Sequence, residues 1–156
     1  KNNIVFLHGE NDLNNERLDQ CIKLSGLDEL IKELPNGLDT IVGDKGNFLS
    51  SGQIQRIALA RSLLERPSIL ILDDATSAID IQVESRIHES LKNRLEGCTT
   101  LLIAQRISTI ALADRVVLLD GGKIVDQGTH SSLMARSPLY MSILAEAETS
   151  SHQGGL

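Results

Sequence analysis

The sequence predicts an α/β fold with a mostly parallel sheet flanked by helices. Residues Ile69–Leu72 form a run of four large apolar residues, too short for an isolated helix but typical of a central parallel strand that is covered on both faces. Apolar residues at helical spacing precede this strand over 51–66 and follow it over 83–95. The 156 residues are 41% hydrophobic, so the chain can bury one core and is expected to form one domain or part of one.

The first third of the chain, residues 11–47, is predicted to form a small helical region. Leu18, Ile22 and the segment Leu27–Leu34 have helical spacing. Pro35–Gly37 then interrupts the pattern, because proline and glycine favour turns.

The next predicted helix opens with Ser50, Ser51, Gly52 and Gln53 and ends before Pro67. Its apolar residues at helical spacing are Ile54, Ile57, Ala58 and Leu64. The first N–H groups of a helix have no intrahelical partner and lie at the positive end of the helix dipole. The turn that opens this helix is therefore a candidate site for an anion such as the γ-phosphate of a nucleotide.

Two carboxylates, Asp73 and Asp74, directly follow the predicted strand. In open α/β sheets, ligands bind at the carboxyl ends of the strands. A carboxylate in that place commonly holds Mg²⁺, directly or through water. The sequence therefore predicts a magnesium and phosphate site at this end of the strand.

A helix is predicted from Val83 to Leu95. The residues expected to face inward are Val83, Ile87, Leu91 and Leu95. His88 falls one residue past this stripe, so its side chain is expected at the surface or at its boundary. The four histidines show no metal-ligand spacing, so none is assigned to a metal or to catalysis.

The last part of the chain is predicted to be rich in strands. Strands are expected over Thr99–Ala104 and Val116–Leu119. Gly121–Gly122 offers a tight turn into a third strand, Lys123–Val125, which predicts a hairpin. The polar tail from Thr149 is expected to be disordered.

The composition excludes several function classes. Aromatic residues make up 2% of the chain, the net charge is -6 and the pI is about 5.1, so neither stacking platforms nor a basic surface for nucleic acid is expected. Cys21 and Cys98 show no CxxC spacing, which suits a reducing compartment. No apolar run approaches the roughly 20 residues of a transmembrane helix and no signal peptide opens the chain, so membrane association is expected only through a partner or a further segment.

Four motifs follow one another along the chain. They read LPNGLDTIVGDKG over 34–46, LSSGQ over 49–53, LIAQRISTI over 102–110 and VLLDGGKIVDQGTH over 117–130. In this order they resemble the nucleotide-binding domain of ABC transporters, whose signature motif is LSGGQ, and specifically that of exporters of drugs, lipids or peptides. The resemblance covers roughly Phe6 to Ala145 and rests on the joint order of the motifs.

The resemblance implies an incomplete ABC ATPase domain of the P-loop NTPase type. No G-x-x-x-x-G-K-[ST] motif occurs, so Walker A is missing, and no glutamine precedes Gln20, so the chain is expected to begin just beyond the Q-loop. The expected division is 1–10, a segment that follows the Q-loop; 11–66, a helical subdomain with the signature helix; 67–148, the carboxyl-terminal half of the ATPase core; and 149–156, the tail. Alone, the chain is expected to be inactive.

Two residues depart from the family pattern at its catalytic positions. Asp73 matches the Walker B aspartate that holds Mg²⁺, but Asp74 stands where the family usually has the glutamate that activates water, and Gln105 stands where it has the switch histidine. Aspartate is one methylene shorter, and glutamine does not titrate near neutral pH, so slow hydrolysis is expected. Either change alone could be a tolerated variant, but the pair resembles the degenerate half of heterodimeric exporters.

In that architecture each ATP site joins the Walker motifs of one subunit to the signature of the other. Ser50–Gln53 is therefore expected to bind ATP in the partner's site. Ser51 stands where glycine is usual, and its hydroxyl could add a phosphate donor or crowd the backbone. Ser77 and Asp80 resemble the D-loop, which communicates across the dimer, although an aspartate before a helix is more often a cap.

The resemblance also implies partners and a location. The expected partners are a second nucleotide-binding domain and the transmembrane domains of an exporter, at the cytoplasmic face of a membrane, with ATP and Mg²⁺ as cofactors. Asp44 and Lys45 either contact the membrane domain or are ordinary surface charges on a turn. Two other functions stay open: a regulatory module that binds nucleotide without hydrolysis, and a chromosome-maintenance ATPase. The latter should carry a long coiled coil before its signature, and residues 1–48 have no heptad pattern.

Overall fold

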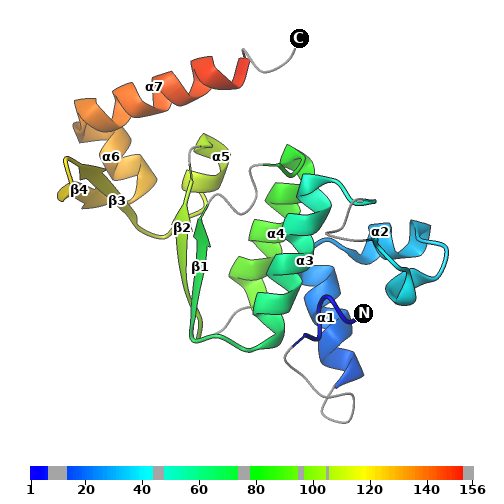
Figure 1. Cartoon of the computed structure of the whole chain (residues 1–156). Helices are drawn as coiled ribbons and strands as arrows, with labels where there is room; N and C mark the ends of the chain where they lie inside the picture. The colour runs from blue at the N-terminus through cyan, green and yellow to red at the C-terminus, as the bar shows by residue number, and fades with distance from the viewer. Residues whose placement is uncertain (7–13, 44–47, 74–77, 95–96, 105, 153–156) are drawn as a thin grey trace. The chain divides into compact units, whose positions relative to one another are not determined.

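The computed structural model describes residues 1–6, 14–43, 48–73, 78–94, 97–104 and 106–152. Helices and strands alternate along much of the chain, so the predicted α/β class is confirmed (Figure 1). The chain forms two compact units, Lys1–Leu101 and Leu102–Leu156. The four-part division expected from the sequence stays a prediction.

The first unit opens with three short helical elements, α1 (Asn15–Leu24), α2 (Asp28–Glu33) and the 3₁₀ turn η1 (Gly37–Asp39). They confirm the helical region predicted over the first third of the chain. Leu18 and Ile22 are buried on α1, as their spacing indicates. The helical pattern breaks where proline and glycine predict it, between α2 and η1.

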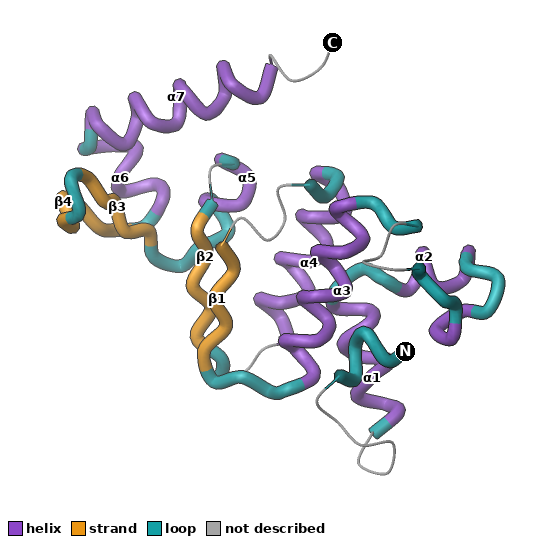
Figure 2. The backbone as a smooth tube through the Cα atoms, in the orientation of Figure 1, coloured by secondary structure: helices purple, strands orange, loops and turns teal. Residues whose placement is uncertain are grey.

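Helix α3 (Ser51–Leu64) packs against α1, and Figure 2 shows the two helices together in the helical part of the unit. The buried residues of α3 are Gly52, Leu59, Ala60, Leu63 and Leu64. The predicted apolar stripe was therefore wrong except at Leu64, because Ile54 and Ala58 are exposed and Ile57 is half-buried. Apolar residues lie on nearly every side of this helix, so periodicity alone could not identify the face that packs on α1.

A strand–helix–strand unit follows, formed by β1 (Ile69–Asp73), α4 (Ile81–Arg94) and β2 (Thr99–Ile103). The two strands pair in one sheet. The N–H of Thr99 donates to the carbonyl of Ser68 at 2.9 Å, so the starts of the two strands lie together. Together with the helical crossover, this contact makes the pair parallel, as predicted.

The expectation that β1 is covered on both faces is wrong for this chain. Leu70 and Leu72 are buried, but Ile69 is 65% exposed and Ile71 is 60% exposed. Successive side chains of a strand point to opposite faces. Only the face that carries Leu70 and Leu72 is covered by the described residues.

Helix α4 confirms most of its predicted inward face. Ile87 and Leu91 are buried and Val83 is half-buried, while Leu95 lies outside the described residues. The predicted surface position of His88 is wrong, because its side chain is only 4% exposed. One helical turn earlier, the equally buried Glu84 lies beside it, and this polar pair is enclosed with the apolar stripe.

The second unit contains α5 (Ile107–Ile110), β3 (Val116–Asp120), β4 (Lys123–Gly128), α6 (His130–Arg136) and α7 (Pro138–His152). The antiparallel β3–β4 hairpin is confirmed, and both turn glycines have positive φ, 54° at Gly121 and 75° at Gly122. The core residues of this unit are Leu118, Leu133, Tyr140 and Leu144. Helix α7 runs to His152, whereas the disordered tail was predicted to begin at Thr149.

Candidate functional site

The first turn of α3 closes on itself through a capping box. The hydroxyl of Ser50 accepts a hydrogen bond from the N–H of Gln53 at 3.2 Å, and the Gln53 side-chain oxygen accepts one from the N–H of Ser50 at 2.9 Å. These reciprocal bonds fix the start of the helix at the place that the sequence predicts. Two of the four predicted anion-binding residues thus use their polar groups within the chain.

The remaining N–H groups of this turn belong to Ser51 and Gly52, which precede the first intrahelical donors. Within the part of the chain that the structure describes, neither group has a hydrogen-bond partner. Ser51 is exposed, whereas Gly52 is buried. Ser51 is therefore the best placed of the four residues to donate to an anion at this helix end.

Gly52 is needed for packing, a role that the sequence did not reveal. A Cβ at this position would overlap the carbonyl oxygen of Ala78 and would lie 3.2 Å from the carbonyl carbon of Ala78 and 3.5 Å from the Cα of Ile79. The side-chain oxygen of Gln55 accepts a hydrogen bond from the N–H of Ala78 at 3.3 Å. The segment before α4 therefore lies directly against the first turn of α3.

Two arginines hold the rest of α3 in place. Arg17 on α1 donates to the carbonyls of Leu64 and Leu63, both at 2.8 Å, and so caps the carboxyl end of α3 with a positive charge. Arg56 on α3 donates to the carbonyl of Gly26 at 2.7 Å, in the turn between α1 and α2. The orientation of the candidate anion site is thus set by the helical region.

The two described carboxylates of the predicted site lie at the ends of their elements. Asp73 is the last residue of β1 and is exposed. Asp80 precedes α4: its carboxylate accepts the N–H of Gln82 at 2.9 Å, and its carbonyl accepts the N–H of Glu84 at 2.8 Å. Asp80 is thus a helix cap, the common role of an aspartate before a helix, and this role does not test its assignment to the D-loop.

Several predicted site residues lie outside the described residues, and their assignments stay predictions. They are Asp74 and Ser77, which follow β1, Gln105, which follows β2, and the charged pair Asp44 and Lys45 before the signature.

The buried pair on α4 is a second cluster of titratable groups. The Nε2 atom of His88 lies 3.7 Å from a carboxylate oxygen of Glu84, too far for a hydrogen bond. Burial lowers the pKa of His88, and the negative charge of Glu84 opposes this effect without cancelling it. The ring is therefore expected to be neutral near pH 7.

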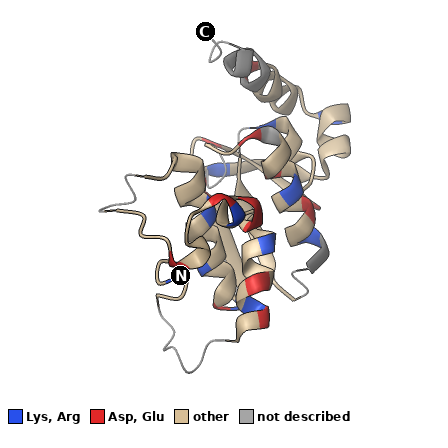
Figure 3. Cartoon of the chain, turned by 90° about the vertical axis from the view of Figure 1, so that its right-hand side faces the viewer, with Lys and Arg blue, Asp and Glu red and all other residues tan. Residues whose placement is uncertain are grey.

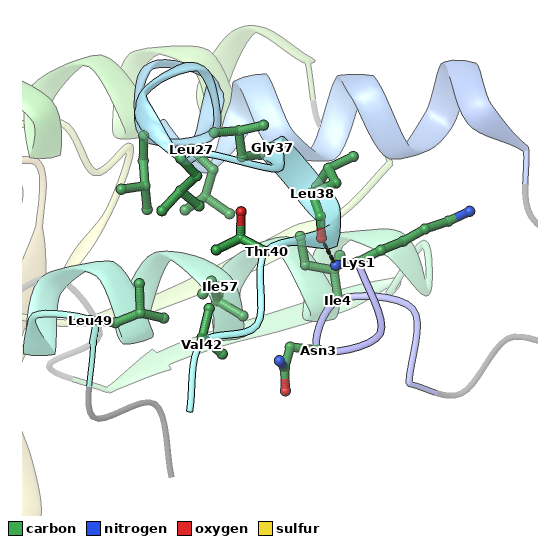
Figure 4. Close-up of a pocket in the computed structure, with 13 residues that line it drawn as sticks. Lys1, Asn3, Ile4, Leu27, Gly37, Leu38, Thr40, Val42, Leu49 and Ile57 are labelled. Carbon is green, nitrogen blue, oxygen red and sulfur yellow. Dashed lines mark hydrogen bonds between the residues drawn. The ribbon is translucent and has the colours of Figure 1, made fainter. Parts of the chain in front are cut away.

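A pocket opens beside α2 and the segment that follows it (Figure 4). Its walls include Leu27, Leu38, Val42 and Ile57, and its thirteen lining residues are apolar except for Lys1, Asn3 and Thr40. A site for a nucleoside triphosphate must supply many hydrogen-bond donors and positive charges to the phosphates. This pocket does not offer them, and Asp73 is not among its lining residues.

Charged residues of both signs are interspersed along the helices (Figure 3). Helix α1, for example, carries Glu16, Arg17, Asp19 and Lys23 within 10 residues. Among the described residues, no group of three or more histidine, cysteine, aspartate or glutamate side chains could hold a metal ion. None of the described helices is long and apolar enough to cross a membrane.

Comparison with known proteins gives one consistent result. A family model described as "ABC transporter" matches residues 2–77. The chain is 43% identical over 143 residues to the uncharacterized ABC transporter ATP-binding protein YfiB of Bacillus subtilis, a match that covers 92% of this chain and 24% of that protein. It is 53% identical over 115 residues to the ATP-dependent lipid A-core flippase of Alkalilimnicola ehrlichii, covering 74% of this chain and 20% of the flippase.

A solved structure agrees over nearly the whole chain. The structure of a bacterial Atm1-family ABC exporter with ATP bound is similar with a TM-score of 0.83 and 37% sequence identity, covering 93% of this chain and 25% of the exporter chain. This chain thus spans a fifth to a quarter of the length of these relatives.

Proposed function

Since the chain belongs to the family of ABC transporter ATP-binding proteins, we propose that it is part of the ATP-binding component of an exporter, in which ATP binding and hydrolysis drive transport across a membrane. The observation that carries the proposal is the similarity of 93% of the chain, with a TM-score of 0.83, to an exporter structure with ATP bound. In this scheme residues 11–66 are the helical subdomain, 67–148 belong to the ATPase core, and 1–10 and 149–156 flank them.

The described residues suit magnesium and ATP chemistry. An exposed carboxylate such as Asp73, at the carboxyl end of a parallel strand, is a hard oxygen donor of the kind that Mg²⁺ prefers, directly or through water. Bound Mg²⁺ would neutralise charge on the phosphates of ATP. The first turn of α3 supplies N–H groups and a dipole for a phosphate oxygen.

We assign the phosphate contact of α3 to the ATP site of a partner subunit, with Ser51 and Gly52 as the donors. The capping box supports this choice within the motif, because Ser50 and Gln53 use their polar groups to close the helix start. Ser50 and Gln53 then act by fixing the turn. The Ser51 hydroxyl adds a donor at the position where the family has glycine.

The site that this chain's own Walker B residues form is proposed to be degenerate. Asp74 keeps the charge of the usual glutamate but is shorter, and Gln105 cannot take up a proton near neutral pH. Loss of general-base help typically costs about 100-fold to 10,000-fold in rate. The complete protein would then be one half of a heterodimer whose other half hydrolyses ATP faster, with Ser77 and Asp80 at the dimer contact.

The proposed membrane partner follows from the similarity to exporters. We propose that the segment around Asp44 and Lys45 contacts the transmembrane domains of the exporter, which would place the chain at the cytoplasmic face of a membrane. The named relatives are transporters, so a chromosome-maintenance function is not proposed.

The test restores the two family residues in the complete protein paired with its partner. The double variant Asp74→Glu, Gln105→His is expected to raise phosphate release by about 100-fold at this site, measured in complexes whose partner site has been inactivated. Asp73→Asn in the same background is the control, because it should abolish the gain by weakening magnesium binding.

A second function has one observation in its favour, the coincidence of Asp74 and Gln105. If the double variant binds ATP but gains no turnover, the site is a regulatory module that holds nucleotide and senses dimer closure. The same experiment therefore separates the two functions.

A further inference from the structure

The first turn of α3 and the segment 78–80 meet at backbone distance. Gly52 is buried, and its missing side chain is what allows the carbonyl of Ala78 to approach. The next residue, Ile79, is only 5% exposed. This contact joins two segments that are far apart in the sequence.

Gln55 adds a directed bond to this contact. Its side-chain oxygen accepts the N–H of Ala78 at 3.3 Å, one turn along the helix from Gly52 and on the same side of it. The carbonyl of Ala78 therefore lies against Gly52, while its N–H is bound by Gln55. Both backbone polar groups of one residue are thus positioned by α3.

Helix α4 begins three residues after Ala78, at Ile81. Asp80 caps it through the N–H groups of Gln82 and Glu84. Since Ala78 is fixed on α3 and Asp80 is fixed on α4, the starts of the two helices are connected through a short, held segment. A displacement of the first turn of α3 is therefore expected to shift the position of Asp80.

We propose that Gln55 is a positioning residue that holds segment 78–80 against the first turn of α3, so that the signature turn and Asp80 are presented to a partner subunit as one rigid unit. The contact of Gln55 and Gly52 with Ala78 is given by the geometry of this chain. Its consequence for ATP turnover rests on the proposed function.

The contact is tested by amide hydrogen exchange in the complete natural protein. Gln55→Met keeps the length of the side chain but removes the acceptor, so exchange at Ala78 and Ile79 is expected to become roughly 2- to 10-fold faster. Gln55→Glu keeps an acceptor oxygen and is expected to stay within about 2-fold of the wild type. Gln20→Met, the same substitution at an exposed position of α1, should leave exchange at both amides unchanged.

The consequence is tested by steady-state ATP turnover in the assembled transporter. Gln55→Met is expected to lower kcat several-fold with little change in the KM for ATP, because the proposed phosphate donors are Ser51 and Gly52 while Gln55 binds the backbone of Ala78, and Gln55→Glu should restore most of the rate. Unchanged exchange at Ala78 in Gln55→Met would overturn the contact itself. Faster exchange with unchanged kcat would overturn only the role of the contact in turnover. A wild-type transporter without ATPase activity would count against the proposed function, and the exchange result would still decide whether the contact exists.

Discussion

Replacing Gly52 with alanine should destabilise this protein, although alanine is the better helix former. The helix-propensity gain is at most about 1 kcal/mol. Against it stands the overlap of the new Cβ with the carbonyl oxygen of Ala78, with the carbonyl carbon only 3.2 Å away. Both atoms belong to the backbone, so no change of rotamer relieves the clash, and forcing such a site apart typically costs about 1–3 kcal/mol. The expected net loss is about 1 kcal/mol in the free energy of unfolding.

The assay is urea unfolding of wild type, Gly52→Ala and Ser51→Ala. Ser51 is the neighbouring exposed residue in the same turn, so its replacement by alanine should change the free energy of unfolding by less than about 0.5 kcal/mol. Stability is the decisive readout, because loss of ATPase activity could come from phosphate binding alone. If Gly52→Ala is as stable as the wild type or more so, the packing role inferred for Gly52 is refuted.

Two further predictions concern the polar side chains of His88 on α4 and Arg17 on α1. Because burial lowers the pKa of His88 below its ordinary value of 6.5, the folded state binds fewer protons than the unfolded state, so stability should fall as pH drops from about 7 through 6.5 towards the lower folded pKa. His88→Gln should flatten this dependence in unfolding curves at a series of pH values, and parallel curves for both proteins would contradict the assignment. Arg17→Met removes two charge-assisted bonds to the carboxyl end of α3 and should cost about 1.5–3 kcal/mol by thermal or urea unfolding. Lys23→Met, an exposed charge on the same helix, should cost less than about 0.5 kcal/mol, and equal losses in the two variants would argue against a specific role of the cap.

The start of α3 and the position of Asp73 could be predicted from the sequence because their signals are local. Ser50 and Gln53 are three residues apart, and their reciprocal hydrogen bonds need no other part of the fold. Asp73 was predicted at a strand end and is found there. The roles of Asp74 and Gln105 depend on a partner and on residues outside those described, so these remain predictions.

Burial was the feature that the sequence predicted least well. The faces of α3 and β1 that pack inward could not be chosen, because both elements carry apolar residues on more than one side. His88 was predicted at the surface or its boundary because it is polar and falls one residue past the apolar stripe of its helix. Each outcome depends on which neighbour covers the element, and a local pattern does not contain that information.

By itself, the sequence determined the start of α3 at Ser50, the strand that ends at Asp73, the hairpin at Gly121–Gly122 and the order of motifs that indicates an ABC transporter ATPase. The helix start and the hairpin follow from hydrogen bonds between near neighbours and from the backbone conformation of the turn glycines. Only the tertiary structure decided that Gly52 and Gln55 meet Ala78 and that Arg17 caps a helix 46 residues further along the chain. Such contacts depend on close packing between distant segments, where a single methyl group or acceptor decides whether two backbones can meet.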